Sequence, residues 1–62
     1  MTDELDPDRM AQAWHEHRVR LNGHADPHAM ALNRQWLRSL TRDERAVEWN
    51  KMLLQMHTDT TE

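Results

Sequence analysis

The five histidines of this 62-residue chain are its side chains best suited to metal binding or proton exchange near neutral pH. His15 and His17 are two positions apart, which on a helix turns them about 200° from each other, so they cannot share one ion. His24 and His28 flank Asp26 and come closer to a cluster, but a zinc site takes three or four ligands and no further one lies nearby. We therefore predict no metal site and no cofactor.

Residue types typical of covalent or acid–base catalysis are missing or isolated. The chain has no Cys and no Tyr, and its single serine, Ser39, has no acid or base placed to activate it. Gly23 is the only glycine, which excludes a glycine-rich phosphate-binding loop. The acidic residues do not gather on one helical face, as paired catalytic carboxylates would. We predict that the protein is not an enzyme.

His17 is a candidate pH-sensitive residue for a separate reason. On a helical wheel it falls inside the apolar arc of its own segment, between Met10 and Ala13. A buried imidazole favours its neutral form, so a fold that buries it should lose stability when acid protonates it, below about pH 6.5.

Asn33 lies in a second apolar arc, where a buried amide needs a hydrogen-bond partner and can set helix register.

The segment from Arg42 to His57 carries apolar side chains around more of its circumference than one core can use. On a helical wheel these side chains form two groups. The group expected to face into the protein consists of Ala46, Val47, Leu53 and Leu54. The group expected to bind a partner consists of Arg45, Trp49, Met52 and Met56. Trp and Arg are frequent in binding hot spots and Met adapts to varied surfaces, although this second group can also be read as core.

Local signals place three helices along the chain. Asp6-Pro7 and Asp26-Pro27 each begin the pattern Asp-Pro-x-x-Met-Ala, in which Asp caps free backbone N–H groups and Pro at the first helical position loses no hydrogen bond. Gly23 suits the left-handed conformation that ends a helix. The residues Thr41 to Glu44 have the spacing of a capping box. The predicted helices span residues 7–21, 27–40 and 42–57.

These elements predict one small all-α domain over residues 1–62, without strands, because no segment alternates apolar and polar residues for long. Two arrangements fit them. One is a three-helix bundle with a tight corner at Thr41. The other is a helical hairpin in which the last two helices are continuous, since no Gly or Pro lies between Ala29 and Gln55. The acidic ends, residues 1–5 and 58–62, are expected to be frayed.

Charge and hydropathy restrict the partners. The net charge is −3, yet residues 9–57 carry eight basic and five acidic side chains, which is not the broad basic surface of a nucleic-acid binder. No stretch approaches the roughly 20 apolar residues that cross a bilayer, and nothing after Met1 resembles a signal peptide. The absence of Cys fits a reducing compartment. We expect a cytoplasmic protein without membrane contact.

Together these patterns predict a non-catalytic protein–protein interaction module, of the adaptor or inhibitor type. Its partner would be a protein of unknown identity or a second copy of the chain in a homodimer. The alternative is a small dimeric DNA-binding transcription regulator, whose phosphate contacts would come from Arg34, Arg38, Arg42 and Arg45. Nucleic acid is the less favoured partner because Asp43 and Glu44 lie between the last two arginines and would repel phosphate.

Overall fold

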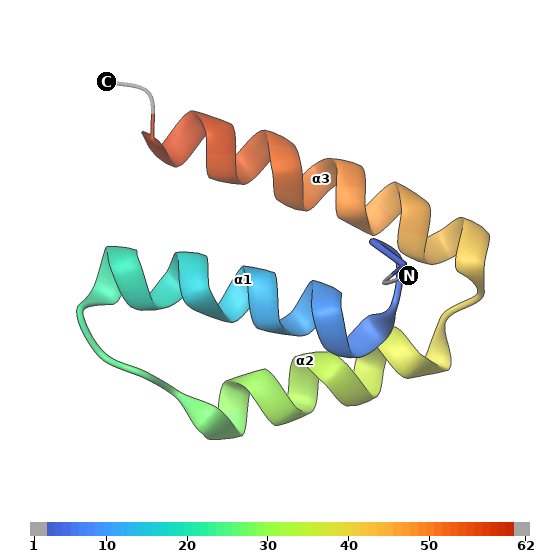
Figure 1. The fold of residues 1–62 in the computed structure, drawn as a ribbon, viewed down its shortest axis with the longest axis horizontal. Helices are drawn as coiled ribbons and strands as arrows, with labels where there is room; N and C mark the ends of the chain where they lie inside the picture. The colour runs from blue at the N-terminus through green and yellow to red at the C-terminus, as the bar shows by residue number, and fades with distance from the viewer. Residues whose placement is uncertain (1–2, 61–62) are drawn as a thin grey trace.

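The computed structural model describes residues 3–60, which form three helices and no strand. The helices are α1 (Pro7–Asn22), α2 (Pro27–Ser39) and α3 (Arg42–Thr60). In Figure 1, α1 lies between α2 and α3, and the three helices run along the long dimension of the molecule. The predicted small all-α bundle is confirmed. The continuous helix over residues 27–57 is not formed, because the chain turns a corner between α2 and α3.

Both Asp-Pro pairs begin a helix, but only one caps it with its side chain. The Asp26 carboxylate accepts a hydrogen bond from the Ala29 N–H at 3.1 Å, as predicted. Asp6 makes no such bond, so the prediction is wrong there. The Asp6 N–H instead donates to the Asp3 carbonyl at 3.0 Å, and its own carbonyl accepts from the Met10 N–H at 2.9 Å. A backbone turn therefore leads the chain into α1.

Gly23 ends α1 as predicted. Its φ of +80° lies in the left-handed region, which a residue without a Cβ adopts at little cost. In this conformation the Gly23 N–H donates to the Val19 carbonyl at 2.7 Å and pairs one of the last free carbonyls of the helix. The chain can then reverse direction and start α2 four residues later.

The corner between α2 and α3 contains the predicted capping box. The Glu44 N–H donates to the Thr41 hydroxyl at 3.2 Å, and the Thr41 N–H donates to the Glu44 carboxylate at 2.9 Å. Hydrogen bonds to the Glu44 carboxylate from the Thr41 backbone N–H, first, and from the Thr41 side chain hold the pKa of Glu44 below its ordinary value. Leu40 takes an extended backbone, with ψ at 152°, and so interrupts the helix. Local side-chain capping thus decides between the two arrangements that the sequence allows.

The C-terminal helix continues to Thr60, past the end predicted at residue 57. The Thr60 hydroxyl bonds to the Met56 and His57 carbonyls, each at 3.0 Å. The Asp59 carboxylate accepts from the Gln55 side chain at 2.8 Å. These bonds explain why residues 58–60 are helical rather than frayed. The remaining predicted frayed positions at the two ends, residues 1–2 and 61–62, lie outside the described residues.

The core is small and α1 is its centre. Among the described residues, the fully or nearly buried hydrophobic side chains are Met10 and Ala11 of α1, Leu37 of α2 and Met52 of α3. Partly buried side chains surround them, namely Leu5, Trp14, Leu40, Trp49 and Met56. Helix α1 packs against both other helices, whereas α2 and α3 barely touch each other.

We predict that Leu37→Ala unfolds much of the protein. Leu37 is fully buried, and a Leu→Ala change in a core removes about 2–5 kcal/mol, while a domain this small has only a few kcal/mol in total. Urea unfolding followed by circular dichroism measures the loss. Leu32→Ala, on the half-exposed side of the same helix, is the matched control and should change stability by about 0.5 kcal/mol or less. Equal losses would show that Leu37 is not a core residue.

Candidate protein-interaction surface

Helix α3 is turned the opposite way to the sequence prediction: the face predicted to point inward is exposed, and the face predicted to point outward lies against the core. The side chains expected to face inward include Val47, Leu53 and Leu54, which are exposed by 55 %, 45 % and 68 %. Met52, expected on the outer face, is only 8 % exposed. Trp49 and Met56, on the same side, pack against the core cluster. The predicted orientation of this helix is therefore wrong.

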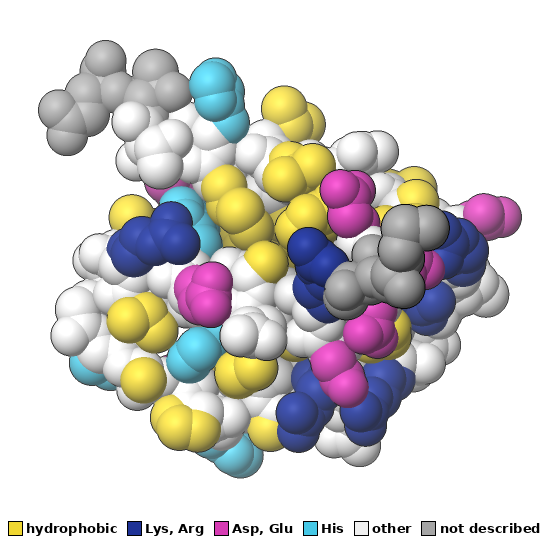
Figure 2. All heavy atoms as spheres, in the orientation of Figure 1, with side chains coloured by type: hydrophobic (Ala, Val, Ile, Leu, Met, Phe, Trp, Pro, Cys, Tyr) yellow, Lys and Arg dark blue, Asp and Glu magenta, His cyan; other side chains and the backbone are white. Residues whose placement is uncertain are grey.

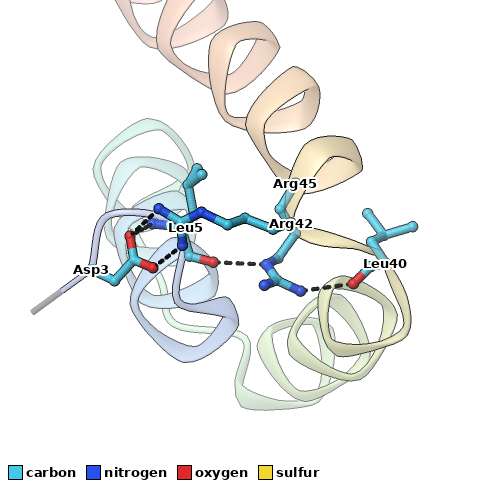
Figure 3. Close-up of polar contacts among 5 residues, drawn as sticks. All are labelled: Asp3, Leu5, Leu40, Arg42 and Arg45. Carbon is cyan, nitrogen blue, oxygen red and sulfur yellow. Dashed lines mark hydrogen bonds and ion pairs between the residues drawn. The ribbon is translucent and has the colours of Figure 1, made fainter.

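Arg45 explains this orientation. Its Nε donates to the Leu5 carbonyl at 2.8 Å, and its Nη1 donates to the Leu40 carbonyl at 2.7 Å (Figure 3). These carbonyls belong to the N-terminal segment and to the corner after α2, neither of which lies on the outer side of α3. The residues four, seven and eleven positions after Arg45 share its helical face. They are Trp49, Met52 and Met56, so the guanidinium brings the whole stripe inward.

An exposed ion pair holds the same corner from outside. The Arg42 guanidinium binds the Asp3 carboxylate through two nitrogens, with Nη2 at 3.3 Å from Oδ1 (Figure 3). The Asp3 carboxylate also accepts from the Leu5 N–H at 3.0 Å. Both donors, Arg42 first, lower the pKa of Asp3 below its ordinary value. Residues 3–5 are thus tied to α3, and the prediction that they are frayed is wrong.

The arginines of the DNA-binding alternative all have acceptors within the molecule. Arg38 Nη2 lies 2.8 Å from the Asp8 carboxylate, and Arg34 Nε lies 3.9 Å from it. Arg42 pairs with Asp3, and Arg45 binds backbone carbonyls. Figure 2 shows basic and acidic side chains interspersed at this end of the bundle, with hydrophobic side chains gathered over α3. A phosphate bound at these arginines would have to compete with these acceptors.

The described residues offer no metal site and no membrane span. Over residues 3–60, no three side chains of the His, Cys, Asp or Glu type lie close enough together to hold a metal ion. His24 instead pairs with the Asn22 carbonyl at 3.2 Å. Within the same residues, no helix combines the length and the apolar character that crossing a bilayer requires.

A groove opens between α2 and α3, which make few contacts with each other. It has a volume of about 620 Å³ and is lined by residues of all three helices, namely Trp14, Arg18, Leu21, Asn33, Trp36, Lys51, Met52, Gln55 and Asp59. Trp14 and Met52 belong to the core or pack against it, whereas Trp36 is 46 % exposed on the α2 side. The groove therefore has apolar and polar side chains in its lining and one exposed aromatic wall. We call it the α2–α3 groove.

The lining of the α2–α3 groove has more positively than negatively charged side chains. Arg18 of α1 and Lys51 of α3 give it two cationic side chains. Lys51 also pairs with Glu48 at 3.3 Å, a residue outside the groove lining. The one carboxylate in the lining, Asp59, is already bonded by His17 and Gln55. The groove is therefore complementary to a ligand with negative charge beside an apolar surface.

His17 is buried, and it joins α1 to the end of α3 beside this groove. Its Nε2 lies 2.7 Å from the Asp59 carboxylate, and its ring centroid lies 5.5 Å from that of Trp14. The hydrogen bond from His17, followed by that from Gln55, holds the pKa of Asp59 below its ordinary value of 3.8. The pH-sensitive candidate thus has a carboxylate partner 42 positions away in the sequence.

A second hollow, between α1 and α2, is smaller. It has a volume of about 220 Å³, below the roughly 300–1,000 Å³ usual for small-molecule pockets. Asn33 lines both hollows, and its buried Nδ2 has no hydrogen-bond acceptor among residues 3–60. The partner that the sequence predicts for this amide is therefore missing within the described chain.

Comparison of the chain with known protein families, curated proteins and solved structures found no match. The sequence prediction missed Trp36 as a surface residue, since it lies on the same apolar arc as the buried Leu37. The width of that apolar arc could have predicted the exposure of Trp36, because one small core cannot cover the whole arc.

We predict that Arg45→Lys destabilises the protein although the charge is kept. Lysine cannot donate to the Leu5 and Leu40 carbonyls in the same fork geometry, and a hydrogen bond from a charged group contributes about 1.5–3 kcal/mol. Urea unfolding measures the change. Arg42→Lys is the control, because its ion pair with Asp3 is exposed and should matter less. A larger loss in the control would contradict the role of Arg45.

We also predict that Asp59→Asn removes an acid-sensitive part of the stability. Because the pKa of Asp59 is lowered in the folded protein, its carboxylate stabilises the fold above the ordinary value of 3.8, and this contribution disappears as the pH falls through the lowered value. The melting temperature of the wild type should exceed that of the variant at about pH 5.5, and the difference should be smaller at about pH 2.5.

Glu4→Gln is the control for this measurement, because it removes an exposed carboxylate far along the sequence from the His17 pair. It should leave the melting temperature nearly unchanged at about pH 5.5. If the wild type and Asp59→Asn differ equally at both pH values, Asp59 acts through packing and not through its charge.

Proposed function

We propose that the protein is a non-catalytic interaction module, of the adaptor or inhibitor type, that binds an amphipathic helix of a protein partner in the α2–α3 groove. One observation carries this proposal: α2 and α3 barely touch, so Trp36 stands 46 % exposed beside Trp14 and Met52. A helix laid between α2 and α3 would cover this surface and complete a four-helix arrangement, as helices do in other apolar grooves.

The residue types of the groove suit binding. Tryptophan is among the side chains that contribute most to protein interfaces, because it buries a large area with few rotatable bonds. Methionine adapts its shape to varied partners. Of the four residues that the sequence predicts to bind a partner, Met52 lines this groove and Arg45, Trp49 and Met56 do not. Met52 is therefore the one retained in the proposal.

The charges of the groove define the partner further. Arg18 and Lys51 favour a helix with Asp or Glu next to its apolar stripe, while the Asp59 carboxylate is already occupied by donors of this chain. Charge complementarity of this kind selects partners and speeds association more than it adds affinity. Salt should therefore slow binding without abolishing it.

We predict that Trp36→Ala weakens peptide binding at least about tenfold, the effect of a hot-spot residue. The probes are helical peptides selected from a random library against the wild-type protein, with affinities measured by isothermal titration calorimetry. The selected peptides should share apolar residues at i, i+3, i+4 and i+7 with acidic residues beside them. Because Trp36 is half-exposed, the variant should keep its helical content by circular dichroism.

Leu54→Ala is the matched control, since Leu54 is exposed on α3 and does not line the groove. It should bind the selected peptides as the wild type does. The proposal fails if the library yields no binder, or if the binders have equal affinity for Trp36→Ala and the wild type.

A further inference from the structure

The hollow between α1 and α2 has a wall of hydrogen-bond donors and apolar side chains that the described chain leaves uncovered. It lies where the two helices separate toward residues 23–26, the segment that joins them (Figure 1). We infer that this hollow binds a small organic carboxylate, with one negative charge on a body about the size of an aromatic ring. The inference does not rest on the proposed function, because His15, Val19 and Met30 line the hollow and not the α2–α3 groove.

The Asn33 side chain supplies the first donor. Its Nδ2 is buried and has no hydrogen-bond acceptor among residues 3–60. A buried N–H group without an acceptor costs free energy, which an oxygen atom of a ligand can recover. Asn33 lines the hollow, and the last torsion of an amide side chain has a broad range, so a small rotation directs the N–H into this space.

Arg18 supplies a positive charge in the same wall. Its guanidinium forms no hydrogen bond or ion pair with another side chain or carbonyl of residues 3–60, and the Asp59 carboxylate attracts it only through space. Arg38 and Arg42, in contrast, already bind carboxylates of this chain. The planar guanidinium binds a carboxylate through two parallel hydrogen bonds. One arginine with open donors therefore suits a ligand with one carboxylate.

The other polar groups of the hollow indicate where the negative end of the ligand lies. The His15 ring has no partner among residues 3–60 and can donate an N–H. Asp26, the one carboxylate of the lining, would repel an anion, but it accepts from the Ala29 N–H. It also comes seven positions before Asn33, about 10 Å along α2. The ligand carboxylate is thus expected beside Arg18, His15 and Asn33, away from Asp26.

Apolar side chains form the rest of the wall. They are Ala11, Trp14, Val19, Ala29 and Met30. The two alanines leave the space open, and the Trp14 indole offers a surface on which a flat ring can stack. The volume of about 220 Å³ is too small for a drug-sized molecule. A single charge beside an apolar surface in this volume favours an aromatic carboxylate over inorganic phosphate or a nucleotide.

Titration of the full chain with benzoate at neutral pH, followed by NMR, tests the site. The side-chain amide signal of Asn33 and the indole signal of Trp14 should shift and saturate, with a Kd in the micromolar to low millimolar range expected of so small a ligand. Benzamide has the ring without the charge, and acetate has the charge without the ring. Each should bind at least about tenfold more weakly. The inference is overturned by the absence of a saturable shift with benzoate, or by equal affinity for benzamide or acetate.

Arg18→Gln should weaken benzoate binding at least about tenfold, because it removes the charge that the carboxylate meets. Arg20→Gln is the matched control: it removes the same charge from the same helix, and Arg20 does not line the hollow. This control should bind benzoate nearly as the wild type does. Equal losses in the two variants would show a general effect of net charge and would contradict a site at Arg18.

Asn33→Leu separates a ligand-binding role of the amide from a structural one. The variant should lose benzoate binding and keep its resistance to urea, because it removes a buried group that has no partner in the described chain. Undiminished binding, or a loss of stability along with binding, would contradict the role of Asn33. Trp36→Ala should bind benzoate as the wild type does, since Trp36 lines only the α2–α3 groove. Failure of the peptide-binding proposal can thus be told apart from failure of this inference.

Discussion

The two hydrogen bonds of Arg45 set the rotation of α3, and this rotation decides which surfaces the protein exposes. The carbonyls of Leu5 and Leu40 both lie where the chain has left helical geometry, and an unpaired backbone carbonyl is costly when it is buried. Arginine can serve both at once because its donors form a rigid fork. One side chain thus joins the N-terminal segment, the corner after α2 and the first turn of α3.

The small core then limits what can be covered. With α1 in the centre and α2 and α3 barely in contact, each outer helix buries only the side that faces α1. Trp36 on α2 and Leu54 on α3 stay exposed for this reason and not because their residue types favour water. The α2–α3 groove and the exposed apolar side chains of α3 are two results of the same shortage of interior volume.

The acidic ends of the chain form ion pairs with its basic middle part in the folded protein. The carboxylates near the ends find cationic or imidazole partners on distant elements: Asp3 pairs with Arg42, Asp8 with Arg38 and Asp59 with His17. The two exposed pairs, Asp3 with Arg42 and Asp8 with Arg38, each add little stability, but they help to position the segments that they join. The acidic ends therefore act as counter-charges to the basic body of the chain. They also occupy the arginines that a phosphate would need.

The sequence by itself determined the helices, because their signals are local: Asp26 caps its own helix, Gly23 ends α1, and Thr41 and Glu44 cap each other within four residues. Each of these contacts joins residues at most four positions apart and needs no tertiary packing. The burial of His17 could also be predicted from the sequence, because His17 lies within an apolar arc of its helix.

Only the tertiary structure decided which way α3 faces, which partner His17 has and where a groove remains. Periodicity shows that α3 has two apolar sides, but not which one lies against α1. The side with Val47, Leu53 and Leu54 is the more hydrophobic by residue type, and yet it is the exposed one. That choice depends on Arg45 reaching carbonyls 40 and 5 positions before it, and the pairing of His17 with Asp59 spans 42 positions. Contacts between residues so far apart arise only when the helices pack, and no local pattern records them.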